Sequence, residues 1–504
     1  MSFREDLAAA PLLHNPEPRH TLRRSQNRLA MIEVPSKPSK AVIVSGPSRR
    51  RILEGLAATA PLLAVAPALA VPDQSWKALA ADVRAQMAWT WHHYAERCLG
   101  QDQIRPVSGT GAAFFFRNGP PLGLSIVEAL DTLYLMGLDA ELAQGVRWIA
   151  DNLHFEIDGE VQLFETGIRM VGGLLSGWGA TKEKKLLALA RDLADRLSPA
   201  FAKSLTGMPY RFVNLKTGAV RDARSFPAEI GTYIAEWGML GKALGEKRYF
   251  DMAKRATKAL FDRRSSINLV ADTIDIETGE WQSRRATVGP PTDSYLEYLW
   301  DGWQLFADPD FKHWYDIHAA AIAKYQAAEL NGQLWFPQVD FETGALLDHH
   351  QSELAAFYAG LLAQGGDFKR GKAYLASWAG VQARYGVLPE GYDYAKAAPD
   401  RVTNQLRPEF VDSCLNLFLL EPDERWRRLA RIHFETMKET SRTRYGFTVI
   451  DDIMTRPMKQ GDLCPGYWWS EQMKYYWLLF SDTDRFDYKT NYLSTEGNVL
   501  VGLK

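Results

Sequence analysis

The chain has few cysteines and no marked excess of charge. Its 504 residues include only Cys98, Cys414 and Cys464, so we expect no disulfide framework, although one bridge remains open. No CxxC or CxxH spacing indicates a zinc or iron–sulfur site. The net charge of -2 excludes a strongly basic protein and argues against nucleic acid as a partner. Motifs of serine hydrolases, P-loop enzymes, zinc proteases and dinucleotide-binding proteins are also missing.

Residues 1–72 differ in composition from the rest and predict an N-terminal extension with an export signal. A basic, proline-rich stretch leads to SRRRIL at 48–53, and an alanine-rich apolar run then ends in Ala68, Leu69 and Ala70. This order resembles a bacterial twin-arginine signal cleaved near Ala70 and predicts a periplasmic or secreted protein. The alternative is a disordered tail. Two prolines and a glutamate make the run a poor membrane span, and no other segment is long and apolar enough.

From about residue 75 onward, hydrophobic periodicity predicts a succession of helices separated by Gly-, Pro- and Asp-rich breaks. We predict helices at 75–97, 124–135, 139–153, 164–178, 181–196, 227–243, 247–264, 292–306, 310–327, 351–362, 369–380, 407–419, 423–440 and 467–480. The odd helices are amphipathic and charged, whereas the even ones are apolar or aromatic on most sides. This alternation is typical of an outer and an inner layer.

Residues 73–504 are therefore predicted to form one all-α domain, an (α/α)7 barrel of seven helical hairpins. A linear helical solenoid is the alternative, but it usually shows a sequence repeat, which we do not find. Short β-like pieces between the helices are candidate hairpins at the barrel mouth, and they lie at 159–164, 210–222, 274–288, 334–346, 446–454 and 491–502.

Each even helix begins with, or within one turn of, a carboxylate. The seven acids are Glu128, Glu165, Glu229, Asp293, Glu353, Glu409 and Glu471. The helix dipole favours an acid in the first turn by roughly 0.3–1 kcal/mol, which explains any one of them alone. Because the helices of one layer run parallel, however, all seven would ring one mouth of the barrel.

Several buried carboxylates repel one another and lose hydration, so they need a compensating charge. Arg169, four residues after Glu165, and Arg407, two before Glu409, relieve part of it. A divalent cation would relieve more, and oxygen ligands select calcium or magnesium over zinc. Two carboxylates in a pocket are also what a glycoside hydrolase needs to protonate the leaving oxygen and to activate water or attack directly.

Five ordered motifs resemble those of the class I α-1,2-mannosidases, glycoside hydrolase family 47. They are SIVEALDTLYLMGL at 125–138, FETGIR at 164–169, TDSYLEYL at 292–299, LRPE at 406–409 and STE at 494–496. The resemblance covers the chain from about Trp89 to Leu500. It implies an (α/α)7 barrel, an exo-acting inverting mannosidase, a C-terminal β-hairpin that closes the barrel, and a Ca²⁺ ion bound by the hydroxyl and carbonyl of Thr495.

Residue roles follow from the same resemblance. Glu165 or Asp293 would be the general acid and Glu409 the general base, with acid and base roughly 6.5–9.5 Å apart to admit water. The implied substrate is a mannose-containing oligosaccharide or mannan, and we expect a monomer. The expected substrate-binding residues are Arg169, Glu229, Arg407, Phe357, Glu471 and Glu496.

The chain departs from the family pattern at two places. Asp412 stands where the family usually has glutamate, and residues 352–360 lack the histidine and cysteine of the processing enzymes and look closer to the degradation-enhancing branch. The family's usual disulfide has no clear counterpart. Three other functions stay open: a non-catalytic mannose-binding lectin, an (α/α)-barrel glycosidase for another sugar, and a helical scaffold for protein partners.

The exported protein should begin near Ala70, because signal peptidases cut behind a small-residue pattern. The unusually long stretch before the arginines also suggests that translation starts near Ser48 rather than at residue 1. N-terminal sequencing of exported protein tests both statements, and residues before Ser48 retained in it would contradict them.

Overall fold

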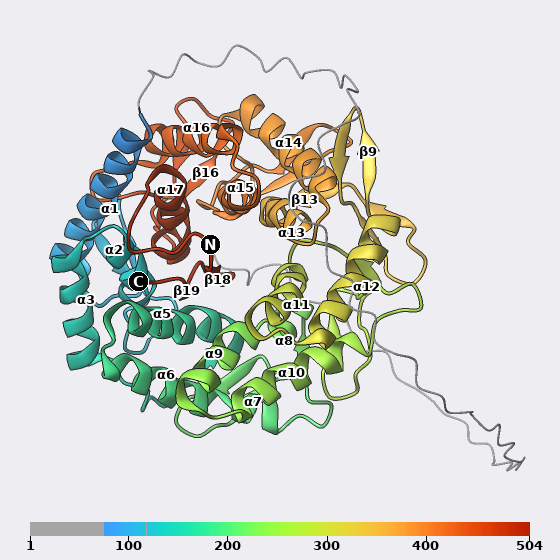
Figure 1. Ribbon diagram of the computed structural model, residues 1–504, viewed down its shortest axis with the longest axis horizontal. Helices are drawn as coiled ribbons and strands as arrows, with labels where there is room; N and C mark the ends of the chain where they lie inside the picture. The colour runs from blue at the N-terminus through green and yellow to red at the C-terminus, as the bar shows by residue number, and fades with distance from the viewer. Residues whose placement is uncertain (1–74, 117) are drawn as a thin grey trace, which may run out of the picture. The chain divides into compact units, whose positions relative to one another are not determined.

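The computed structural model describes residues 75–116 and 118–504, so the predicted export signal and its cleavage near Ala70 lie outside the described residues. In this part of the chain, an outer ring of helices surrounds an inner ring (Figure 1). The outer ring consists of α1 (Trp76–Cys98), α3 (Asp139–Asn152), α6 (Lys184–Leu197), α10 (Arg248–Phe261), α12 (Pro309–Tyr325), α14 (Phe368–Tyr385) and α16 (Glu424–Ser441).

The inner ring is built from shorter and less regular segments. In chain order they are α2 (Leu124–Leu135), α4 (Leu163–Glu165) with the π-helix η1 (Thr166–Val171) and α5 (Gly172–Thr181), α8 (Pro227–Gly231) with α9 (Ile234–Leu244), α11 (Asp293–Phe306), the 3-10 helix η2 (Glu353–Phe357) with α13 (Tyr358–Gln364), α15 (Glu409–Leu420), and the π-helix η3 (Trp468–Gln472) with α17 (Met473–Phe480). Because α17 contacts both α1 and α2, the ring is closed. The predicted (α/α)7 barrel is confirmed.

The burial of the two rings explains their different compositions. Outer helix α6 buries a stripe that includes Leu186, Leu189 and Leu193, and turns its charged face to solvent. Inner helix α2 buries every residue except Tyr134. An additional short helix, α7 (Pro199–Ala202), follows α6 and was not predicted.

Several inner helices that the periodicity predicts as continuous are interrupted near their first turns. The predicted helix 164–178 contains the π-helix η1, and 467–480 begins with the π-helix η3. The helix predicted at 227–243 breaks after Gly231, and the one at 351–362 starts as the 3-10 helix η2. Apolar periodicity does not encode such breaks, and π-helical turns occur frequently at functional sites.

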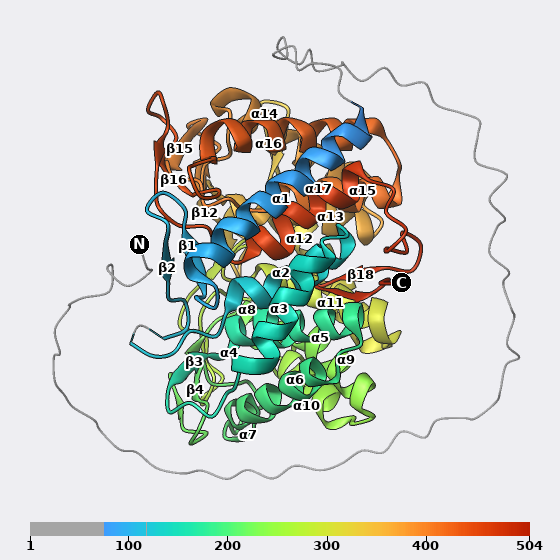
Figure 2. The same cartoon turned by 90° about the vertical axis from the view of Figure 1, so that its left-hand side faces the viewer.

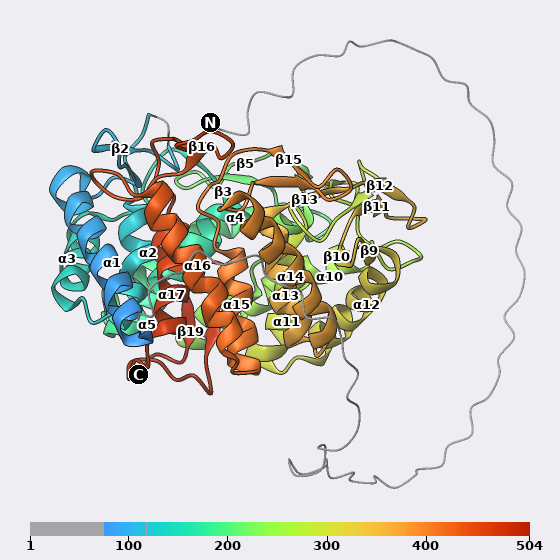
Figure 3. The same cartoon turned by 90° about the horizontal axis from the view of Figure 1, so that it is seen from above.

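Short antiparallel strands connect the helices, and most of them gather at one end of the ring (Figure 3). They are β1 (Gln103–Arg105), β2 (Thr110–Ala112), β3 (Glu160–Gln162), β4 (Phe212–Asn214), β5 (Val220–Arg221), β6 (Arg224–Ser225), β7 (Ile274–Asp275), β8 (Arg285–Ala286), β9 (Ala328–Leu330), β10 (Gln333–Trp335), β11 (Gln338–Asp340), β12 (Leu346–Asp348), β13 (His350–Ser352), β14 (Gly391–Asp393), β15 (Ala398–Arg401), β16 (Ile450–Asp452) and β17 (Lys459–Gln460). Sheets β3–β4–β5, β8–β11–β12 and β13–β14–β15 join connections that are separate in sequence.

Three of these connections use the same tight turn. The side-chain oxygens of Asn214, Asp275 and Asp340 each accept backbone N–H groups two and three residues later, at 2.9–3.0 Å. A Thr-Gly pair follows in each turn, and the glycine has a positive φ that glycine adopts without strain. This local chemistry explains why hairpins form where the sequence predicted short β-like pieces.

A C-terminal hairpin of β18 (Tyr492–Leu493) and β19 (Val499–Val501) enters the ring from the end opposite most of the strands (Figure 2). The backbone N–H of Val499 donates to Asp131 of α2 at 2.8 Å, and the Asn498 amide donates to the Ile168 carbonyl of η1 at 3.1 Å. Lys474 of α17 donates to the Gly497 carbonyl. The hairpin therefore closes this end of the barrel, as predicted.

All three cysteines are described, and each is buried and free of disulfide bonds. Within residues 75–116 and 118–504, none of the helices combines the length and apolarity that a bilayer span requires.

Replacing Lys474 should destabilise the barrel strongly. Its ammonium group is fully buried, 2.7 Å from Asp131, and Lys474→Met would leave that carboxylate without its cation. We expect a loss of about 3–5 kcal/mol in the free energy of unfolding, measured by chemical denaturation. The double variant Asp131→Asn with Lys474→Met should recover part of the loss. A single variant within about 1 kcal/mol of the wild type would contradict this role of the pair.

Candidate active site

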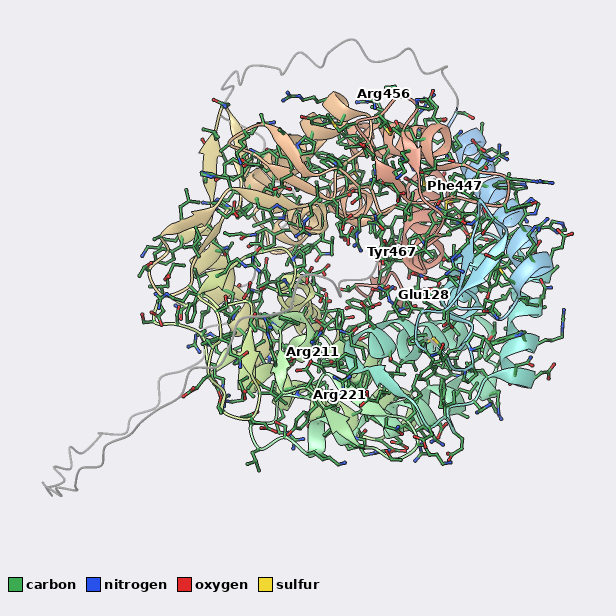
Figure 4. All side chains as sticks on the ribbon, turned by 180° about the vertical axis from the view of Figure 1, so that it is seen from behind. Glu128, Arg211, Arg221, Phe447, Arg456 and Tyr467 are labelled. Atoms are coloured by element: carbon green, nitrogen blue, oxygen red, sulfur yellow. The ribbon has the colours of Figure 1, made fainter. Side chains whose placement is uncertain are left out.

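Six of the seven predicted acids lie in the first turn of an inner-ring segment, and Glu128 lies one turn into α2, at the end where most strands gather. Figure 4 looks onto this end, where Glu128, Tyr467 and Arg211 lie around the centre and come from different parts of the chain. The acids also influence one another electrostatically: Glu165 raises the pKa of Asp293, and Asp293 raises that of Glu409. The structure thus brings the three predicted catalytic carboxylates into one charged region.

Arg169 holds together three carboxylates from distant segments. Its guanidinium lies 2.7 Å from Glu165 and 3.0 Å from Glu128, and it also forms an ion pair with Glu496 of the C-terminal turn. Burial raises the pKa of both Glu128 and Glu496. Arg169 opposes this shift without cancelling it, because three acids share its single positive charge. An added side chain at Gly466 would place its Cβ 1.7 Å from Glu128 Oε2, so any larger residue there would displace this carboxylate.

Glu229 is bound by a second arginine that the sequence did not indicate. Arg211, which directly precedes β4, donates to both carboxylate oxygens of Glu229 and also contacts Asp222 at 3.0 Å. The Gln162 amide donates to Glu229 as well, at 2.6 Å. Gln162 immediately precedes the short helix that carries Glu165, so Glu229 is linked to the neighbouring inner segment.

Arg407 pairs with Glu390 rather than with Glu409. Its Nε and Nη2 donate to Glu390 Oε1 at 3.0 and 2.9 Å. The Tyr467 ring lies between the two central arginines, 5.7 Å from the guanidinium carbon of Arg169 and 5.2 Å from that of Arg407. Tyr467 therefore connects the Glu165 side of the pocket with the Glu409 side through two cation–π contacts.

The predicted base and one of the predicted acids have raised pKa values. Burial raises the pKa of Glu409 to about 8, and that of Asp293 to about 6, although Arg407 opposes both shifts. Glu409 Oε2 is buried and has no hydrogen-bond partner among the described residues. Glu165 keeps 27% of its side chain exposed. A carboxyl group that can hold a proton and one open to solvent are both present.

Two predicted residues are more deeply enclosed. Glu353 is fully buried, and neither of its carboxylate oxygens has a partner within the described chain. Burial raises its pKa well above the usual range, which favours the protonated form. Phe357, predicted as a substrate contact, is 3% exposed and packs against Tyr358, so in this structure it is a core residue.

A second row of acids lies one or two helical turns deeper. Glu297 and Asp301 follow Asp293 along α11, and Asp412 follows Glu409 along α15. The Thr495 hydroxyl donates to Glu297 at 2.8 Å, which puts the tip of the C-terminal hairpin at this depth.

Glu471, also predicted, accepts from Tyr475 at 3.1 Å, and burial raises its pKa.

The residues around Thr495 fit a hard divalent cation. Their polar groups are carboxylates and hydroxyls, and in the described chain neither Glu297, Asp301 nor Asp412 forms an ion pair with lysine or arginine. Burial raises the pKa of Asp412 to about 7 and that of Glu297 well above its usual range. No set of three His, Cys, Asp or Glu side chains in the described chain could hold a metal ion directly. A cation here would depend on Thr495 oxygens and on water held by the acids.

Sequence reasoning missed several members of this region. Glu297 and Asp301 could have been found from their spacing of four and eight residues after Asp293, which places them on one helix face. Arg211 and Glu390 lie in connections between helices, and Tyr467 lies at the start of the last inner segment. No spacing rule links them to the charged groups that they contact, which are Glu229 for Arg211, Arg407 for Glu390, and Arg169 and Arg407 for Tyr467. Only the fold brings them there.

Without bound metal, the protein should lose stability as the pH rises. Raised pKa values mean that the native state binds more protons than the unfolded chain, whose carboxyl groups titrate near about 4. The stability contributed by Glu409 and Asp412 is thus complete below about pH 4. It is lost as the pH rises through about 7 for Asp412 and through about 8 for Glu409. The melting temperature in EDTA should fall between about pH 5 and about pH 8.

Asp412→Asn should make this fall shallower, because it removes one of the buried groups. The exposed Asp251→Asn is the matched control and should leave the slope unchanged. A melting temperature that rises over the same pH range would contradict the buried negative charge.

Comparison with known proteins identifies the family. The model of glycosyl hydrolase family 47 matches residues 86–501. Alpha-mannosidase I MNS5 of Arabidopsis thaliana is 31% identical over 391 residues, covering 74% of this chain and 67% of that protein. Mannosyl-oligosaccharide 1,2-alpha-mannosidase IB of Mus musculus is 29% identical over 448 residues, 84% of this chain and 69% of its own length.

A solved structure agrees on the fold. The alpha-1,2-mannosidase from Trichoderma reesei superposes with a TM-score of 0.76 at 21% identity, and the match covers 84% of this chain and 99% of that one. The helical rings, the acids at their first turns and the family match over 86–501 lead to one conclusion. The chain belongs to glycosyl hydrolase family 47 and is a glycoside hydrolase.

Proposed function

We propose that this glycoside hydrolase removes terminal α-1,2-linked mannose from a mannose-containing oligosaccharide or mannan, with inversion and with bound calcium. The relatives named as 1,2-alpha-mannosidases support the substrate. The observation that carries the chemistry is the meeting of Glu165, Asp293 and Glu409 at one end of the barrel, each at the start of a different inner segment.

In the proposed reaction, a carboxyl group donates its proton to the glycosidic oxygen as the bond to the anomeric carbon breaks. Glu165 or Asp293 supplies this proton. The exposure of Glu165 favours contact with a leaving group, and the pKa of about 6 at Asp293 lets that carboxyl group hold a proton in mildly acidic solution.

Glu409 acts as the base that takes a proton from the attacking water. Its Oε2 is buried and free of partners among the described residues, so it can accept that proton. With its pKa raised to about 8 by burial, Glu409 needs nearby positive charge to be ionised at neutral pH. Arg407 provides part of this charge.

Calcium is proposed at Thr495, held by that residue's hydroxyl and carbonyl oxygens. When bound, it supplies positive charge and oxygen coordination for sugar hydroxyls. Glu297, which accepts from the Thr495 hydroxyl, and Asp412 would orient metal-bound water. Arg169, Glu229, Arg407, Glu471 and Glu496 shape the surrounding pocket. Export through the signal at residues 48–70 is also a proposal.

Two other functions remain as alternatives. A mannose-binding lectin on the same scaffold would use the pocket without turnover, but a lectin has no need for an acid–base pair. An (α/α)-barrel glycosidase for another sugar would share the acids, yet it would not need the Thr495 hairpin at the metal position.

Proton NMR of the protein with α-1,2-mannobiose and calcium should show β-mannose as the first product, because water attacks opposite the leaving group. Excess chelator should abolish its formation. Glu409→Gln should lower kcat by about 10²–10⁴-fold while retaining sugar binding. α-Mannose as the first product would contradict inversion, and binding without any turnover by the wild type would favour the lectin.

A further inference from the structure

A cavity of about 350 Å³ lies on the rim of the barrel, and no inner-ring helix contributes to its lining. Its walls come from the segment after α10, the turn between β7 and β8, and the turn between β11 and β12. These two turns belong to the repeated Thr-Gly hairpins. The volume lies in the range of small-molecule binding sites in proteins.

Trp281 forms the aromatic wall of this cavity and is held in place before any ligand arrives. Its indole N–H donates to the Arg263 carbonyl at 2.7 Å, and its ring packs against the buried Phe341 with centroids 5.7 Å apart. An antiparallel backbone bridge between Trp281 and Ile274 of β7 holds the main chain at this position. Because the ring is already oriented, binding would cost little side-chain entropy.

The charged groups of the cavity are of both signs. Arg284 is paired with Asp340 and Glu342, whereas the Arg263 guanidinium forms no ion pair within the described residues and donates to the Ala259 carbonyl at 2.6 Å. Glu280 also lines the cavity and is exposed. Carboxylates disfavour an anion and arginines disfavour a cation. A neutral ligand with many hydroxyl donors and acceptors suits both.

The cavity lies at the same end of the barrel as the catalytic acids. Strand β7 pairs with β6, which leads directly into α8 and Glu229, and β8 precedes α11 and Asp293. The connections that lead to Glu229 and Asp293 are thus continuous with, or hydrogen-bonded to, the walls of this cavity.

We propose that the Trp281 cavity binds a sugar residue of the oligosaccharide whose terminal mannose is in the barrel, with the flat face of the ring on the indole and its hydroxyls on Arg263 and Glu280. The proposal rests on the proposed function and adds that the natural substrate is larger than a disaccharide. A disaccharide fills the barrel alone, whereas a branched oligomannose engages both places.

Steady-state kinetics on two substrates tests this. Trp281→Ala should raise KM for a branched oligomannose by about tenfold with kcat unchanged, and leave mannobiose kinetics within about twofold. Arg263→Gln, which keeps the indole, should raise the same KM by about threefold, and Trp281→Tyr should retain most of the wild-type value. Trp178→Ala, a partly exposed tryptophan at the far end of α5, is the matched control and should match the wild type. The proposal would be overturned if Trp281→Ala and Arg263→Gln raised KM for mannobiose as much as KM for the branched oligomannose. It would also be overturned if they changed neither KM.

A binding measurement keeps this proposal separate from the proposed function. In native gels containing mannan, the Glu409→Gln protein should be retarded, and adding Trp281→Ala should raise the dissociation constant about fivefold or more, whereas adding Trp178→Ala should not. If the wild type fails to cleave mannobiose, the proposed function fails while this readout still stands. Equal retardation of the two double variants would refute the rim site.

Discussion

The Arg169 guanidinium lies between three carboxylates that come from α2, the segment before η1, and the C-terminal turn. It is buried, and so are most of the acids around it. A buried charge is stable only when it is paired and hydrogen-bonded. Arg169 therefore does two things at once: it neutralises part of an acidic pocket, and it fixes the first inner helix to the last segment of the chain.

The remaining negative charge shapes the rest of the pocket. Arg211 and Arg407 are each bound to an acid of their own, Glu229 and Glu390, so neither is free to neutralise the deeper row. Glu297, Asp301 and Asp412 are left with hydroxyl, amide or tyrosine contacts. The cation proposed at Thr495 would balance part of this charge through water held by these acids.

The sequence predicts the barrel well because each ring has its own composition. Helices such as α6 carry a single apolar stripe, helices such as α2 are buried on nearly all sides, and that difference is visible without a structure. The seven acids were found for a related reason, since each lies at a predictable helix start. What could not be predicted depends on contacts across the chain: the π-helical turns, the pairing of β8 with β11, and the arrival of Tyr467 between two arginines.

The C-terminal hairpin has a consequence for the order of events during synthesis. Thr495 and Glu496 lie in its turn, and Asp131 and Ile168, which bind that turn, are made more than 300 residues earlier. The inner pocket therefore stays incomplete on the ribosome until this hairpin itself has emerged. Formation of the pocket is thus coupled to synthesis of the β18–β19 hairpin, and a chain without β19 would lack the clamp that seals the barrel.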